Sequence, residues 1–296
     1  MERVTEAGHG HLAMLTFSAL VAGSFSLGAL AANHISPLAL TAPRFALAAA
    51  LVGSVALMSG QLDRSALKSP WRYLLLGSVF AAYFVLMFEG LKTAPPVSAA
   101  AVFTLVPPMA ALFGWVLLRQ KPTKRMVLAL TLGGIGAIWV IFRADWQALR
   151  GFRPGSGELT YFWGCVAHAV YVPLVRLLNR GEAAVTFTFG TLVAGALVLT
   201  VVGWDDIRTT DWARLPAIVW ITLVYVAVFA SAATFVLVQF ATLRLPSAKV
   251  MAYTYLTPSW VILWEIALGN HAPPLLVLTG IALTILALFL MMKDET

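Results

Sequence analysis

Long apolar runs dominate the pattern along this chain, and short polar stretches separate them. A helix needs about 20 mostly apolar residues to cross a bilayer. Ten segments reach or approach that length, and most breaks between them contain Gly, Pro, Asn or charged residues. The pattern therefore predicts ten transmembrane helices, at residues 12–33, 36–59, 71–92, 95–118, 125–143, 158–178, 184–202, 214–241, 246–269 and 273–292.

Part of this pattern occurs twice. Residues 84–122 resemble residues 235–273 under a shift of 151 positions with no gap. The shift aligns three pairs of prolines: Pro95 with Pro246, Pro107 with Pro258, and Pro122 with Pro273. Proline breaks helices, so shared proline spacing is better evidence of common origin than shared apolar residues are. The pattern predicts two repeats of five helices, residues 1–150 and residues 151–296.

An odd number of helices per repeat makes the second repeat enter the membrane from the opposite side. The fold expected is thus an all-α integral membrane protein whose two five-helix repeats are inverted relative to each other. Inverted repeats recur in secondary transporters, because one structure can then adopt two mirror-like states. By this analogy of architecture, the sequence predicts a transporter.

Composition agrees with a membrane location. The chain is 60% apolar and 11% charged, whereas soluble domains carry about 25% charged residues. The net charge of +7 is spread over short connections, so it does not indicate nucleic-acid binding. With the N-terminus placed in the cytoplasm, 12 Lys and Arg residues lie inside and 6 outside, which predicts cytoplasmic N- and C-termini. Cys165 stands alone, so the chain cannot form an internal disulfide.

Three charged residues fall within or near the ends of the predicted spans, where charge is costly and often functional. Arg44 either has a functional role or neutralises a neighbouring carboxylate or helix end. Glu89 either couples transport to ion movement or simply pairs with Lys92, three residues away. Glu265 either has a functional role or reaches toward the membrane surface. These residues are candidates for structural or coupling charges.

Polar aromatic residues and one histidine also fall at mid-depth. A buried Tyr hydroxyl needs a partner or water, so several of them together indicate a wet, aromatic-lined cavity for an amphipathic solute. Ordinary core packing, or a structural hydrogen bond in the case of the histidine, is the alternative. The candidate substrate-binding residues are Tyr83, Trp163, His168, Tyr171, Tyr225 and Tyr253. Neither a second His nor a carboxylate stands at metal-ligand spacing, so neither a metal site nor a cofactor is expected.

Prolines and glycines suggest how the helices bend and pack. Pro107 and Pro258 fall near the middle of the fourth and ninth predicted helices, where proline removes a hydrogen bond and kinks the helix. Related kinks in both repeats indicate paired gating elements, with static kinks as the alternative. The run Gly133-Gly134-Ile135-Gly136 in the fifth helix is typical of close helix packing.

These residues together resemble a known family. The motifs are Pro37-x6-Arg44, Tyr83…Ala94-Pro95, Leu105-Val106-Pro107 and Gly133-Gly134-Ile135-Gly136, then Pro246, Leu256-Thr257-Pro258 and Thr279-Gly280-Ile281. They are similar to those of the drug/metabolite transporter superfamily, in its EamA-type branch. Within it, the chain is similar overall to the YddG-type amino-acid exporters of bacterial inner membranes. The family's usual Gly-Glu is replaced by Leu118-Arg119-Gln120 and Gly269-Asn270-His271, so roles tied to that glutamate do not carry over.

The resemblance implies a secondary transporter of the bacterial inner membrane. It would export amino acids, including aromatic or apolar ones, by alternating access through a central cavity between the repeats. A multidrug or other small-metabolite exporter is the alternative. The expected partners are a small-molecule substrate and the lipid bilayer, without nucleic acid, and the oligomeric state is left open with a monomer among the options. No catalytic constellation is found in the sequence, so an enzyme is not expected.

Overall fold

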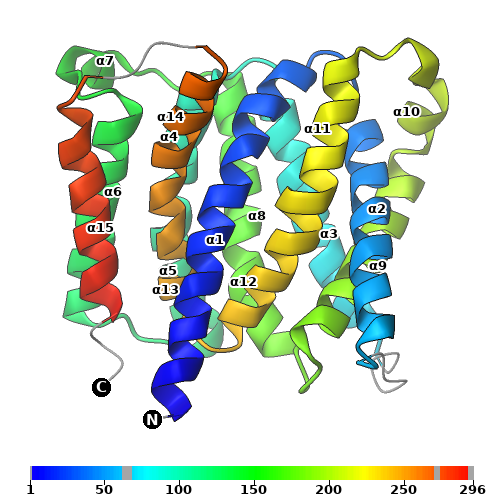
Figure 1. Cartoon of the computed structure of the whole chain (residues 1–296), viewed down its shortest axis with the longest axis horizontal. Coiled ribbons are helices and arrows are strands. Elements are labelled where there is room, and N and C mark those ends of the chain that lie inside the picture. Colours follow the sequence, from blue (N-terminus) through cyan, green and yellow to red (C-terminus); the bar gives the residue numbers. More distant parts are fainter. Residues whose placement is uncertain (1, 62–68, 270–273, 293–296) are drawn as a thin grey trace.

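The computed structural model describes residues 2–61, 69–269 and 274–292, and this part of the chain is helical without any strand. The helices run side by side as one bundle (Figure 1). Eight helical stretches are long and apolar enough to cross a membrane: Glu6–Ala31, Pro37–Met58, Trp71–Gly90, Ser98–Leu118, Lys124–Ile141, Ser156–Leu178, Ala184–Val202 and Ala217–Thr242. The prediction of an all-helical membrane protein is therefore confirmed.

Most predicted spans correspond to one continuous helix. These are α1 (Glu2–Ala31), α2 (Pro37–Met58), α3 (Trp71–Gly90), α6 (Lys124–Ile141), α8 (Ser156–Leu178), α9 (Ala184–Val202) and α15 (Val277–Met292). Short surface helices, α7 (Trp146–Gly151) and α10 (Trp204–Thr209), lie on the side of the bundle opposite the first turn of α1 and the last turn of α15 (Figure 1). The first turn of α1 and the last turn of α15 lie on the same side, and the cytoplasmic location of that side stays a prediction.

Two spans are interrupted in the middle by a short turn. The fourth consists of α4 (Pro96–Phe103) and α5 (Val106–Leu118). The ninth consists of α13 (Ser247–Ala252), a 3₁₀ turn at Tyr253–Leu256 and α14 (Thr257–Ala267). The first of these is still one membrane-length helical stretch, Ser98–Leu118, and kinking at the two prolines stays a prediction.

Pro107 and Pro258 occupy the second position of α5 and of α14. Proline fits the first turn of a helix, because its missing N–H has no intrahelical partner there. The two prolines therefore start new helices, and their role in gating stays a prediction. Pro273, which belongs to the predicted repeat, lies outside the described residues.

A third span is continuous but contains a wider turn. It runs from α11 (Ala217–Ala227) through a π-helical turn at Val228–Ala233 into α12 (Thr234–Thr242). A π turn displaces backbone carbonyls from the regular α-helical pattern, and such turns occur frequently at functional sites. This one lies next to α2 and α1.

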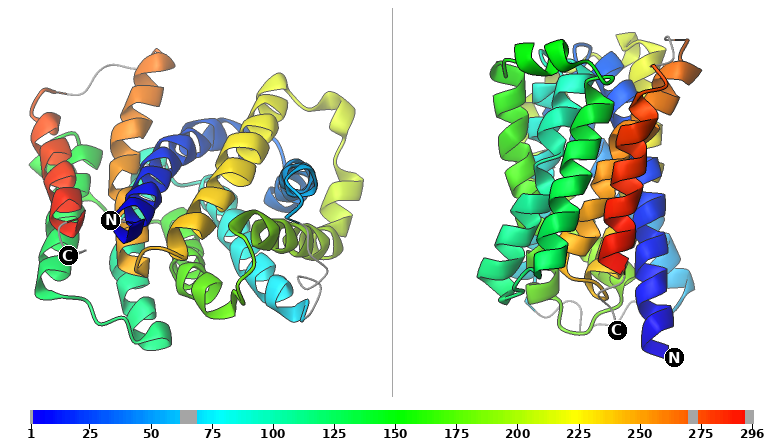
Figure 2. Two further views of the ribbon diagram at one scale, coloured as in Figure 1. Left: turned by 60° about the horizontal axis from the view of Figure 1, so that its bottom comes forward. Right: turned by 90° about the vertical axis from the view of Figure 1, so that its left-hand side faces the viewer.

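The helices pack in defined pairs that Figure 2 lets the reader follow. Helix α15 lies along α6, α2 along α9, and α3 along both α8 and α9. Helix α1 packs against α12 and α14, and α5 packs against α8 and α13. Large apolar side chains such as Leu47, Leu51 and Val55 of α2 are exposed on the outside of the bundle, as expected of helix faces that contact lipid.

A buried ion pair fixes the end of α3 on the side of the chain termini. Arg72 is 1% exposed, and its Nη2 donates to Glu182 Oε1 at 2.7 Å. Its Nη1 donates to the carbonyl oxygen of Leu178, the last residue of α8, at 2.6 Å. Burial raises the pKa of Glu182, but the hydrogen bonds from Arg72 and from the Arg180 backbone N–H lower it further, so the pKa lies below its ordinary value.

We expect Glu182→Gln to lower the free energy of unfolding by about 3 kcal/mol at neutral pH, because the buried Arg72 guanidinium loses its counter-charge. Because the pKa of Glu182 is lowered in the folded state, the stabilisation by the Arg72–Glu182 pair is fully present above the ordinary pKa of a glutamate. This stabilisation is lost as the pH falls through the pKa of Glu182 in the folded protein. The measurement is thermal unfolding in detergent against pH, with Glu89→Gln as control, since the Glu89–Lys92 pair is partly exposed. Equal unfolding midpoints for the two variants at pH 7 would contradict the expectation.

Candidate functional site

Stacked aromatic rings from three helices fill the centre of the bundle. The ring of Phe80 in α3 stacks on Tyr171 of α8, with centroids 4.1 Å apart and planes 10° apart. It also contacts Phe235 of α12 at 4.2 Å and His168 of α8 at 5.4 Å. Residues three and four apart share a helix face, which brings Phe80, Tyr83 and Phe84 of α3 together against the face of α8 that carries His168 and Tyr171. We call this group the aromatic cluster.

His168 is the polar group at the middle of the aromatic cluster. It is 1% exposed, and its ring centroid lies 4.3 Å from that of Tyr83 and 5.8 Å from that of Phe103. Neither ring nitrogen has a hydrogen-bond partner within the described part of the chain. A buried polar group without a partner is costly, and it requires an explanation such as a ligand or a bound water.

Gln239 of α12 borders the same cluster, and the sequence analysis did not single it out. Its Nε2 donates to Tyr171 Oη at 3.0 Å, whereas its Oε1 has no partner among the described residues. Gln239 is fully buried. The signal that could have revealed it is a lone amide side chain in an otherwise apolar span, since such residues are rare inside membranes unless they bond to something.

Arg44 of α2 is fully buried and joins the cluster through Phe84, whose ring centroid lies 3.6 Å from Arg44 Cζ. Arg44 Nε donates to Ser231 Oγ at 2.6 Å, and Nη2 donates to the Ala230 carbonyl oxygen at 2.8 Å. Both acceptors belong to the π-helical turn. Among the described residues, Arg44 has no carboxylate partner, and its Nη1 has no hydrogen-bond partner. The site therefore contains a buried cation with one free donor group.

The structure brings together three of the six predicted substrate-binding residues, namely Tyr83, His168 and Tyr171. Trp163 is 63% exposed and faces away from the cluster. Tyr225 Oη donates to the Leu20 carbonyl oxygen at 2.9 Å, so this hydroxyl joins α11 to α1. Tyr253 Oη lies 2.7 Å from His11 Nδ1, at the start of the 3₁₀ turn that precedes α14.

Sequence reasoning also missed Tyr161, which lies seven residues before His168 on the same face of α8. Its ring centroid lies 6.3 Å from those of Tyr83 and Phe103. Helical spacing from His168 could have identified it, because residues at i and i+7 share a face.

The two acidic candidates lie away from the cluster. Lys92 Nζ donates to Glu89 Oε2 at 2.7 Å on a partly exposed surface, which confirms the simple pairing of these two residues. Ser26 Oγ donates to Glu265 Oε1 at 2.7 Å and so links α1 to α14. A coupling role for either carboxylate stays a prediction. Within residues 2–61, 69–269 and 274–292, no group of three His, Cys, Asp or Glu side chains could hold a metal ion.

Comparison with known proteins identifies the class of this membrane protein. The model of the EamA-like transporter family matches the chain twice, at residues 8–142 and 155–293. The chain belongs to the EamA-like transporter family. The resemblance to the EamA-type branch is thus confirmed, whereas the resemblance to YddG-type exporters stays a prediction.

The chain is also similar to one curated transporter and to one solved structure. Over 262 residues the chain is 26% identical to the uncharacterized transporter YyaM of Bacillus subtilis, covering 88% of this chain and 86% of YyaM. It also superimposes on a crystal structure of a protein with a TM-score of 0.75 and 21% identity, covering 97% of this chain and 96% of the other. The second match shows a shared fold. This EamA-like transporter is therefore a multi-pass membrane protein.

Proposed function

We propose that this protein exports amino acids, including those with apolar or aromatic side chains, across a bacterial cytoplasmic membrane. The observation that carries this proposal is a set of buried polar groups, in and beside the aromatic cluster, that have no partner among the described residues. They include both nitrogens of His168, Nη1 of Arg44 and Oε1 of Gln239. Groups of this kind are costly at membrane depth unless a solute or water satisfies them for part of the transport cycle.

An amino acid has the chemistry that these groups lack. Its carboxylate suits Arg44 Nη1, because a guanidinium binds carboxylates through charge-assisted hydrogen bonds. Its ammonium group suits Gln239 Oε1 and the faces of the surrounding rings, which attract cations. An apolar side chain would then lie among Phe80, Phe84 and Phe235, where burial of apolar surface favours binding.

In the proposed mechanism, alternating access arises from ten helices arranged as two inverted repeats, residues 1–150 and 151–296. Two observations support it. The family model matches once in each half. The packing of the helices is also symmetric. In the proposed repeats, α1 is the counterpart of α8, and α3 is the counterpart of the span α11–α12. The packing of α3 against α8 therefore has its counterpart in the packing of α12 against α1. The pairs α2–α9 and α6–α15 each consist of equivalent helices.

The broken helices differ between the two sides of the membrane, as a structure in one of two alternating states would. On the side of the chain termini, α5 packs against α13, and the Ser247 backbone N–H donates to Gln120 Oε1 at 3.1 Å. Their equivalents on the other side, α14 and α4, make few contacts. In the opposite state of the proposed cycle, α14 would pack against α4, and α5 would separate from α13. The helices would bend at the turns next to Pro107 and Pro258.

The proposal is tested by counterflow in proteoliposomes, with one labelled aromatic amino acid and a panel of unlabelled competitors. Saturable uptake that several amino acids block is the expected result. Exchange of drugs or other metabolites without competition by amino acids would overturn the substrate class and favour the multidrug or metabolite exporter. Absence of counterflow with every compound, in a preparation that unfolds cooperatively, would overturn the proposed site.

Within this test, His168→Ala is expected to lower the counterflow rate about tenfold or more. The mutation removes a polar group from the centre of the proposed site, and one hydrogen bond to a charged group is worth about 1.5–3 kcal/mol. Trp163→Ala is the matched control on the same helix, because its side chain is exposed on the other face of α8, and it should keep the wild-type rate. Equal rates for both variants would remove His168 from the site.

A further inference from the structure

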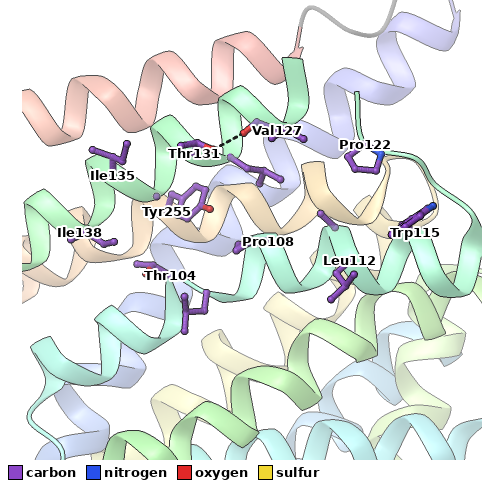
Figure 3. A pocket seen from close by; sticks show the side chains of 14 residues that line it. Thr104, Pro108, Leu112, Trp115, Pro122, Val127, Thr131, Ile135, Ile138 and Tyr255 are labelled. Carbon is purple, nitrogen blue, oxygen red and sulfur yellow. Dashed lines mark hydrogen bonds between the residues drawn. The ribbon is translucent and has the colours of Figure 1, made fainter. Parts of the chain in front are cut away.

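Two apolar grooves lie on the outside of the bundle, and they occupy equivalent positions in the two halves of the chain. The first has a volume of about 520 Å³ and lies between α4–α5 and α6 (Figure 3). The second has a volume of about 480 Å³ and lies between α14 and α15. Under the shift of 151 residues, Leu105 and Leu112 of the first groove correspond to Leu256 and Leu263 of the second.

Large apolar side chains that line the first groove are exposed, so the groove faces the hydrocarbon core of the membrane. Leu105, Leu112 and Trp115 on one wall and Val127 and Ile135 on the other are each more than 40% exposed. Lipid acyl chains surround these helices in a bilayer, and a concave apolar surface at that depth binds them through close packing.

The first groove is distinguished by the charges at one end. On α6, the wall residues Val127, Thr131 and Ile138 follow each other at spacings of four and seven residues. Lys124 precedes Val127 by three residues and so continues the same helix face. Arg119 directly follows the last residue of α5, four residues after the wall residue Trp115. Pro122, which closes this end of the groove, is next to Lys121 in the chain (Figure 3). Three cations therefore gather where the apolar walls end.

These cations are available to a ligand. Arg119, Lys121 and Lys124 are exposed, and none of them forms an ion pair with an acidic side chain in the part of the chain that the structure describes. They lie between the end of α5 and the start of α6, on the side of the bundle where α1 begins and α15 ends (Figure 1). At that level a phospholipid carries its phosphate, and basic residues beside transmembrane helices attract anionic headgroups.

We propose that the first groove is a binding site for one anionic phospholipid of the surrounding leaflet. An acyl chain lies between α4–α5 and α6, and the phosphate contacts Arg119, Lys121 and Lys124. The second groove is the matched control that the chain itself provides. Its equivalents of those three cations are Asn270, Ala272 and Leu275. The described residues that line it carry no charge, so we expect it to bind acyl chains without headgroup selectivity.

The experiment compares the two grooves in the full-length protein. A benzoylphenylalanine is introduced at Leu112 or at Leu263, and the protein is reconstituted in phosphatidylglycerol and phosphatidylcholine with identical acyl chains. After irradiation, mass spectrometry gives the ratio of the two lipid adducts. We expect a higher phosphatidylglycerol share at position 112 than at position 263, by roughly fivefold for each cation that contacts the phosphate.

Charge variants test the cause of that selectivity. R119Q/K124Q should reduce the ratio at position 112 by roughly 25-fold, which leaves only the roughly fivefold excess that Lys121 provides. R150Q/R153Q, which removes two exposed cations from the opposite side of the bundle, should leave it unchanged. The ratio at position 263 reports whether the variant is folded and reconstituted, since it should not change. Equal ratios at the two positions, an equal effect of both double variants, or no phospholipid adduct at position 112 would overturn the proposal.

Discussion

Replacing Arg44 by methionine is expected to lower amino-acid counterflow by about 100-fold while leaving the protein folded. In the proposed site, Arg44 Nη1 is the donor for the substrate carboxylate, and methionine cannot donate. The loss of one or two charge-assisted hydrogen bonds, each worth about 1.5–3 kcal/mol, is large enough for a 100-fold effect.

Folding should survive this change for a separate reason. Arg44 is a buried cation without a carboxylate partner in the described chain, so its removal leaves no buried anion uncompensated. An apolar side chain of similar length fills the same volume and avoids the cost of burying a charge. In this variant Ser231 and the Ala230 carbonyl group lose their hydrogen-bond donor, which limits the gain in stability from removing the buried charge.

Two further measurements separate substrate binding from a structural role of Arg44. Arg44→Lys keeps the charge but loses the planar fork of donors, so we expect intermediate transport. Ser231→Ala removes the acceptor of Nε while keeping Nη1, so it should reduce transport far less than Arg44→Met does. Amino acids that stabilise the wild-type protein against heat should fail to stabilise Arg44→Met. Wild-type transport by a folded Arg44→Met protein would show that the guanidinium does not contact substrate.

The helical type of the apolar runs could be predicted from the sequence, but the places where the helices are interrupted could not. An apolar run of about 20 residues can satisfy its backbone in a membrane only as a helix, so composition alone specifies the spans. Pro107 and Pro258 are compatible with either a kink or a new first turn, and packing against neighbouring helices decides between them. The π-helical turn has no sequence signature, because its Ala230 carbonyl group finds its partner in Arg44, 186 positions away.

Membership in the candidate site was harder to predict because helices in a membrane are apolar on all sides. The usual contrast between a polar and an apolar face is then missing, so periodicity does not tell which face is inside. Trp163 and His168 are five residues apart, which places them about 140° apart around the helix axis. That separation put His168 in the cluster and Trp163 on the outer surface. Gln239 stands out in the sequence as a lone amide in an apolar span, but its contact with Tyr171 is what places it beside the cluster.

Gly136→Ala is expected to lower the unfolding temperature of the protein, because helices α6 and α15 touch through their backbones at this residue. A methyl group on Gly136 would lie 2.6 Å from the carbonyl oxygen of Gly280, and one on Gly280 would lie 2.6 Å from the carbonyl oxygen of Gly136. Backbone atoms cannot rotate away as a side chain can, so the two helices must separate. We expect a loss of about 2–3 kcal/mol in the free energy of unfolding, at the upper end of the cost of overpacking.

Gly134→Ala is the control for this change, two residues away on the same helix. A methyl group there would lie 3.5 Å from Tyr255 Oη, which is an ordinary contact, and the position borders the first groove. Alanine also favours helix over glycine by about 1 kcal/mol, so this variant should be as stable as the wild type or more stable. Thermal unfolding of both variants in one detergent separates the backbone clash at Gly136 from the general effect of replacing a helical glycine by alanine. If the two midpoints shift in the same direction by similar amounts, the close approach of Gly136 and Gly280 does not limit the packing of α6 against α15.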